Sequence, residues 1–199
     1  MTALAHHPHP VTRAVTGVRE QLSGVAGMPL WSMGAEETTT TMAEVQAAKA
    51  QLAALESALL THARQTDLPG HTAATSTADW HAATTRTTKP VAHRTMRLAA
   101  GLASHDLTRA ALAEGRVHVE QAEVILKALS DLPDDLDTDV VEKAERQLLD
   151  YADQFDAKTL KTLGRRILEV IDPDAADAHE AKLLAVSYTH LTLPTNREV

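Results

Sequence analysis

The residues best suited to chemistry in this sequence are the cations of one short, acid-free stretch. Between Trp80 and His105 there is no Asp or Glu, although the chain carries a formal net charge of -8. The basic side chains of this stretch that we single out are Arg86, Lys89, His93, Arg94 and Arg97. Arg94 and Arg97 lie three residues apart, so one helix face can carry both to adjacent phosphates or to a guanine edge. We therefore interpret these residues as a candidate DNA-binding surface.

A second group of cations follows near the end of the chain, on a segment with helical apolar spacing. Its members are Lys158, Lys161, Arg165 and Arg166. Most runs of charge are ordinary solvated helix faces, and this alternative stays open for both groups. Because the chain as a whole is acidic, we expect any DNA binding to be weak and strongly dependent on salt.

Catalytic and metal-binding patterns are missing from the sequence. Cysteine is absent, which removes disulfides, thiolate nucleophiles and cysteine zinc sites together. The eleven histidines are scattered without an HExxH motif, and the one close group, His6, His7 and His9, lies among prolines. Because a metal site needs converging ligands, we predict no metal site, no cofactor and no catalytic residue in this chain.

Two helical hairpins, spanning residues 77–129, are the elements that must position the first group of cations. The four helical segments expected there are Thr77–Thr84, Thr88–Leu102, Asp106–Glu114 and His118–Leu129. Pro90 suits the first turn of its helix, where the missing amide hydrogen costs nothing. Gly115 suits the left-handed position after a helix. A helix, a short turn and a second helix are typical of a helix-turn-helix pair.

A longer helix is predicted before the hairpins, over residues 41–66, with its N-cap among Thr39–Thr41. Apolar positions recur along it at alternating steps of three and four residues, at Val45, Ala48, Leu52, Leu55, Leu59 and His62. Three heptads lie at the lower limit for a coiled coil. We favour packing of this stripe on the chain's own helices and keep a homo-oligomer seam as the alternative.

An acidic helix and then a basic helix are predicted over residues 137–171. The segment from Asp131 to Asp156 holds ten acids against Lys143 and Arg146, but it keeps a helically spaced apolar stripe. We interpret it as a helix with a solvated acidic back. Apolar residues make up 44% of the chain and only 3% of it is aromatic, which favours an aliphatic, alanine-rich core. The fold class expected is therefore all-α, a multi-helix bundle without a sheet.

Three parts are expected along the chain. Glycines interrupt residues 1–40. We interpret this segment as a weakly ordered arm, with room for one short helix over Val11–Leu22. Residues 41–185 form the helical domain. Residues 186–199, VSYTHLTLPTNREV, contain the only asparagine of the chain and look like a translated sequencing adapter, so we expect a non-native tail.

Membrane and secretory signals are also missing from the sequence. No run approaches the roughly 18 apolar residues that a membrane span needs. The opening residues lack the basic start and apolar core of a signal peptide. We therefore expect a cytoplasmic protein that does not bind membranes.

An ordered series of motifs covers about half of the chain. The motifs are Ala78–Trp80, Arg97–Ala99, ALAEGRVHVEQAEVI at Ala111–Ile125, Leu132–Pro133, ERQLLDYADQFDAKTL at Glu145–Leu160 and RRILEVIDPD at Arg165–Asp174. This series resembles the domain of unknown function 222, the N-terminal helical region of actinobacterial HNH-endonuclease-type proteins. One departure is His118, where the family usually places a helix-capping serine or threonine.

The resemblance implies that a nuclease domain follows in the natural protein, with an HNH site that binds a divalent metal and cleaves DNA. An HNH site needs a histidine base, a second metal-binding histidine and normally an asparagine. Residues 1–185 contain no asparagine, so we expect a truncated chain that does not cut DNA itself. Our first hypothesis is a non-catalytic region that binds or positions double-stranded DNA for the absent nuclease. The alternative is a helical interaction or oligomerisation module without nucleic-acid binding.

Overall fold

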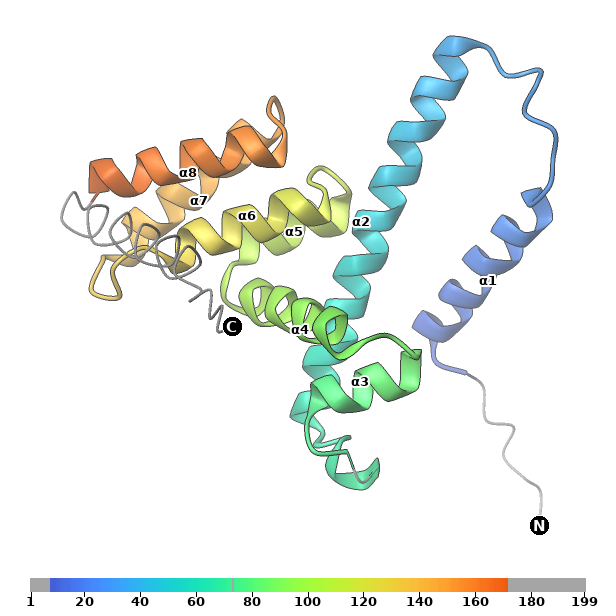
Figure 1. Cartoon of the computed structure of the whole chain (residues 1–199), viewed down its shortest axis with the longest axis horizontal. Coiled ribbons are helices and arrows are strands. Elements are labelled where there is room, and N and C mark those ends of the chain that lie inside the picture. Colours follow the sequence, from blue (N-terminus) through green and yellow to red (C-terminus); the bar gives the residue numbers. More distant parts are fainter. Residues whose placement is uncertain (1–7, 73, 172–199) are drawn as a thin grey trace, which may run out of the picture. The chain divides into compact units, whose positions relative to one another are not determined.

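The computed structural model describes residues 8–72 and 74–171, and α-helices dominate these residues (Figure 1). The helices are α1 (Pro10–Val25), α2 (Ala35–Gln65), α3 (Thr77–Thr85), α4 (Lys89–Ser104), α5 (Asp106–Glu114), α6 (Val119–Ser130), α7 (Thr138–Ala152) and α8 (Ala157–Ile171). One 3₁₀ turn, Gly70–Thr72, lies between α2 and α3. The part of the chain that the structure describes contains no strand, which confirms the all-α prediction. None of its helices is both long and apolar enough to span a membrane.

Some predictions fall on residues that the structure does not describe. These are His6 and His7, the end of the family-like series after Ile171, the remainder of the helical domain up to residue 185, and the tail 186–199. They stay predictions.

The chain divides into two compact units, residues 1–41 and residues 42–199. In the first unit α1 extends the short helix allowed over Val11–Leu22 at both ends. Its first turn contains Pro10, and the His9 ring accepts a hydrogen bond from the Val11 amide at 3.2 Å. No residue of α1 is buried.

The start of α2 differs from the prediction, because the helix begins at Ala35 rather than near Thr41. The hydroxyls of Thr38 and Thr39 donate to the carbonyls of Gly34 and Ala35, four residues back. These threonines therefore lie inside the helix, where such bonds satisfy the hydroxyl without ending the helix. The N-cap predicted among Thr39–Thr41 was wrong.

The apolar stripe of α2 also lies differently from our preferred interpretation. The face of α2 that packs in the second unit carries Ala50, Ser57, Leu60 and Ala63, all of which are buried. By contrast Val45, Leu52 and Leu59 of the predicted stripe are 47%, 43% and 51% exposed. Our preference for packing of this stripe on the chain's own helices was therefore wrong for these three residues, whereas Leu55 is half-buried. Periodicity identified an apolar face correctly but could not tell that a second face, which carries Leu60 among smaller residues, is the one that packs.

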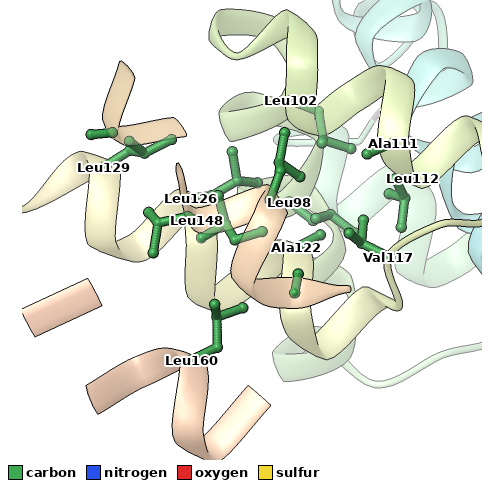
Figure 2. Close-up of a cluster of buried hydrophobic side chains, with 14 of the residues drawn as sticks. Leu98, Leu102, Ala111, Leu112, Val117, Ala122, Leu126, Leu129, Leu148 and Leu160 are labelled. Atoms are coloured by element: carbon green, nitrogen blue, oxygen red, sulfur yellow. The ribbon is translucent and has the colours of Figure 1, made fainter. Parts of the chain in front are cut away.

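The core of the second unit is centred on α6, which packs against α4, α5, α7 and α8. Figure 2 shows leucines and alanines of these helices meeting in one cluster. The side chains at its centre, each almost fully buried, are Leu102, Leu112, Val117, Ile125, Leu148 and Leu160. The aliphatic, alanine-rich core predicted from composition is confirmed.

Two glycines have backbone or packing roles that a larger residue would disturb. Gly115 ends α5 with φ +77°, the left-handed conformation predicted for it. Gly164 lies in α8 where the helix crosses α6, and a Cβ at this position would lie 2.9 Å from the Cβ of Ala128. The absence of a side chain at Gly164 thus sets how closely α8 approaches α6.

Two buried polar side chains tie the later helices together. Glu145 of α7 accepts hydrogen bonds from the amide and the hydroxyl of Thr108, both at 2.7 Å. This carboxylate caps the N-terminus of α5, whose own N-cap residue His105 makes no side-chain cap bond. Because Glu145 is only 4% exposed, it departs from the solvated acidic back predicted for its helix.

Gln121 makes the second tie, between the start of α6 and the end of α7. Its Oε1 accepts from the His118 amide at 2.9 Å. Its Nε2 donates to the carbonyls of Ala152 and Phe155 at 2.8 and 2.9 Å. Gln121 therefore satisfies the backbone amide of the N-cap residue His118, which is one of the two bonds of a capping box.

Candidate nucleic-acid interface

Helix α4 carries most of the first group of cations, and its sequence explains how. Thr88 occupies the N-cap position with extended backbone, and Pro90 lies in the first turn, as expected. Ala92, Leu98 and Leu102 face the core and are buried. The cationic and imidazole side chains on the other side, His93, Arg94 and Arg97, are exposed. This helix is therefore amphipathic, with its basic side chains on the outer side.

Lys89, at the start of α4, is paired with an acid of the preceding helix. Its Nζ lies 2.9 Å from Oδ1 of Asp79 in α3. The other oxygen of Asp79 accepts from the hydroxyls of Thr75 and Ser76 at 2.5 and 2.8 Å. The Lys89 ammonium and these two hydroxyls together hold the pKa of Asp79 well below its usual range. Asp79 is the residue directly before the acid-free stretch, and it forms an ion pair with the first cation of α4.

Arg94 is paired with an acid of α6. Its Nε donates to Oε1 of Glu123 at 2.6 Å and its Nη2 donates to Oε2 at 2.5 Å, a bidentate arrangement. The Glu123 carboxylate, with a smaller contribution from Glu120, raises the pKa of Arg94 above its ordinary value. The stretch that is acid-free in sequence is therefore not acid-free in space.

The remaining members of the first group are Arg86, His93 and Arg97. Arg86 ends α3 in a left-handed conformation with φ 56° and is exposed. Among residues 8–72 and 74–171, no carboxylate lies within 4.0 Å of a basic nitrogen of these three side chains. They form the open part of the first candidate surface.

Helix α8 carries the second group of cations, and Asp156 caps its N-terminus. The Asp156 carboxylate accepts from the Thr159 amide at 2.8 Å, and this bond lowers the pKa of Asp156. Leu160, Gly164 and Leu168 are buried against the rest of the unit. These contacts fix which side of the helix faces outward.

All four cations of α8 are exposed. Arg165 Nε lies 3.5 Å from Oε1 of Glu169, one turn further along the same helix. In the described part of the chain, no carboxylate lies within 4.0 Å of the cationic groups of Lys158, Lys161 and Arg166. The second group is therefore less neutralised than the first.

The described histidines belong to no group of side chains that could hold a metal ion. Within the described ranges, no three His, Asp or Glu side chains are grouped as a metal site would require. The most buried of the described histidines is His81, whose Nε2 lies 2.9 Å from Oε1 of Glu56. His105 Nδ1 lies 3.8 Å from the buried Glu145.

Fold and surface together define an all-helical bundle protein with two basic helix faces. A family model described as "Domain of unknown function (DUF222)" matches residues 39–189, well over half of the chain. The chain therefore belongs to this family, in agreement with the resemblance seen in its motifs. Comparisons with curated proteins and with solved structures returned no match.

Proposed function

We propose that this chain is the non-catalytic helical region of an actinobacterial HNH-endonuclease-type protein of the cytoplasm, and that it binds double-stranded DNA for a nuclease domain. Neither a cofactor nor a catalytic residue is assigned to the chain itself. The divalent metal of the reaction would belong to the nuclease domain. The observation that carries the proposal is the basic face of α8.

Helix α8 suits a phosphate backbone because its four cations are exposed, three of them have no carboxylate within 4.0 Å in the described residues, and the helix itself is packed on the core. Lys158, Lys161 and Arg165 follow one another at steps of three and four residues, so they lie along one side of the helix. Arg166 adds a fourth positive charge beside them. The buried side of the helix keeps this row in place, which limits the entropy lost when DNA binds.

The open cations of the first group support a second, weaker contact. Arg86, His93 and Arg97 are exposed, whereas Lys89 and Arg94 are already bonded to acids. Neither basic group carries an aromatic side chain for base stacking, so the proposal is limited to backbone contacts without sequence preference.

Fluorescence anisotropy with a labelled duplex tests this function at low ionic strength. We expect measurable binding whose affinity falls steeply with added salt, because each phosphate contact contributes a slope of about -0.9 in log-log coordinates. With three to five contacts, the slope should lie roughly between -3 and -5. Binding that is absent at low salt, or that does not change with salt, would contradict the proposal.

One observation favours the alternative of an interaction module, namely the exposed apolar stripe of α2. Such a surface fits a protein partner rather than nucleic acid. It is compatible with DNA binding through α8, because it lies on a different helix.

A further inference from the structure

Within the described part of the second unit, helix α2 has a second apolar face whose large side chains are mostly exposed. The α2 stripe consists of Val45, Ala48, Leu52, Leu55, Leu59 and His62. Val45, Leu52 and Leu59 are between 43% and 51% exposed, Met42 just before the stripe is 58% exposed, and Leu55 is half-buried. Rows of exposed apolar side chains on one helix face are typical of protein interaction sites. We propose that a second copy of this chain covers the α2 stripe in an antiparallel, two-fold arrangement.

The spacing of the stripe favours another helix with the same pattern. Val45, Leu52 and Leu59 lie seven residues apart, and Ala48, Leu55 and His62 follow each of them by three. This is the a and d pattern of a coiled coil, whose partner must repeat it. A second copy supplies that pattern automatically, and a two-fold axis lets the same surface serve both chains.

The sizes of the side chains favour the antiparallel orientation. With the two-fold axis between Leu52 and Leu55, each of these leucines faces the other residue of the second copy. Ala48 then faces Leu59, so a small side chain meets a large one, as close packing requires. In a parallel dimer Ala48 would face Ala48 and leave a gap in the seam.

The charges beside the stripe complement each other in the same arrangement. Lys49 and Glu56 flank the stripe on one side, and in the antiparallel dimer each lies opposite the other residue of the second copy. Glu56 is 47% exposed, with one oxygen 2.9 Å from His81 Nε2. On the other side Glu44 lies opposite Gln65. No like charges oppose each other along this seam, which removes a common obstacle to self-association.

The length of the seam is sufficient because α2 is folded before it dimerises. From Val45 to His62 the stripe extends over roughly 27 Å of helix. An isolated coiled coil of this length must also stabilise its own helices. In this chain the buried face of α2, with Ala50 and Leu60, already holds the helix on its core. The exposed side chains of the stripe, Val45, Leu52 and Leu59, are therefore available for association.

Sedimentation equilibrium of the full chain tests the proposal. We expect a monomer–dimer equilibrium in the wild type, and a rise of at least about 100-fold in the dissociation constant for Leu52→Glu with Leu59→Glu. Both leucines are exposed in the monomer, so the unfolding midpoint of the monomer should stay unchanged. Val91→Glu is the matched control, because Val91 is 49% exposed on α4. It should leave the equilibrium as it is.

Disulfide cross-linking tests the orientation, since the chain has no cysteine of its own. A chain with both Ala48→Cys and Leu59→Cys should form a covalent dimer on mild oxidation, because the antiparallel seam places these positions opposite each other. Either substitution alone should not.

Three results would overturn the inference. A wild type that stays monomeric at every concentration, with unchanged stability in the leucine variant, would show that the α2 stripe does not mediate self-association. A monomer destabilised by the same variant would show that the chain's own residues cover the stripe. Cross-linking by Ala48→Cys alone would show a parallel dimer. None of these results depends on whether the chain binds DNA.

Discussion

Helices α4 and α8 carry similar rows of cations, but the two rows differ in how many of their cations pair with acids of neighbouring helices. Two cations of α4, Lys89 and Arg94, are bonded to acids of α3 and α6. On α8 only Arg165 has a carboxylate within 4.0 Å in the described residues, and this acid comes from its own helix. The comparison teaches that the charge of a helix face depends on the helices packed beside it, not only on its own sequence.

Helix α6 is the origin of much of this difference, because it packs against both basic helices. Toward α4 it presents Glu123, which pairs with Arg94. Toward α8 it presents Ala128, which lies so close to Gly164 that an added Cβ would be 2.9 Å away. Helix α6 therefore neutralises one cation of α4, whereas it packs closely against α8 through small, uncharged residues.

The largest effect we expect comes from breaking the close contact between α6 and α8. Gly164→Leu should push α8 away and lower stability by about 1–3 kcal/mol, or roughly 3–10 °C in the unfolding midpoint. Differential scanning calorimetry measures this directly. Gly17→Leu in α1 is the control, because an added side chain there meets nothing within 4 Å. Equal midpoints for both variants would refute the packing role of Gly164.

The next effect sharpens the comparison by removing the open cations of α8. Lys158→Ala, Lys161→Ala and Arg166→Ala together should weaken duplex binding roughly tenfold to hundredfold at low salt, and make the salt slope shallower by about 3. Lys143→Ala with Arg146→Ala, two cations of the acidic α7, is the control and should change binding little. If the control weakens binding as much, α8 has no special role.

A smaller effect should follow from unmasking Arg94 on α4. Glu123→Gln keeps the shape of the side chain but removes its charge, so Arg94 becomes available to phosphate. We expect duplex affinity to rise roughly twofold to threefold in the anisotropy assay. Asp134→Asn removes one negative charge from an exposed turn and controls for net charge alone. An identical rise in both variants would mean that Arg94 takes no part.

The smallest effect concerns the pairing of Asp79 with Lys89. The pKa of Asp79 is lowered from its ordinary value of 3.8 in the folded chain, so folding favours the charged carboxylate. Its stabilising contribution is present above pH 3.8 and is lost as the pH falls below that value. The difference in unfolding midpoint between wild type and Asp79→Asn should therefore be constant above about pH 5 and shrink in acid.

Asp135→Asn serves as the reference for the pH series, because Asp135 is an exposed turn residue without a hydrogen-bonded partner of this kind. A difference between wild type and Asp79→Asn that does not change with acid would contradict the assigned role of the ion pair.

Capping and turn residues made the helix bounds predictable. The bounds of α5, Asp106–Glu114, agree with the prediction, because Gly115 can adopt a left-handed conformation that stops the helix. The predicted starts of α3 and α4 also lie within one residue of the observed ones. Capping and turn residues act through the neighbouring backbone, so a sequence window contains all the information they need.

The ion pairs and the packed face of α2 were not predictable in the same way. Arg94 and Glu123 are 29 residues apart, and Thr108 and Glu145 are 37 apart, so no local window relates them. On α2 the periodic large residues pointed to one face, while the face that packs carries Leu60 among small side chains such as Ala50. Tertiary contact selects between such faces, and periodicity alone cannot.

The carboxylate of Glu145 at the start of α5 has a consequence for synthesis on the ribosome. Helix α5 has only nine residues, and the side chain that stabilises its first turn is made 37 residues later than Thr108. Until Glu145 has left the exit tunnel, the amide and hydroxyl of Thr108 in the first turn of α5 lack the carboxylate that accepts their hydrogen bonds. The second hairpin should therefore complete its folding only after α7 has emerged, so translation speed between these helices sets how long its leucines remain exposed to chaperones.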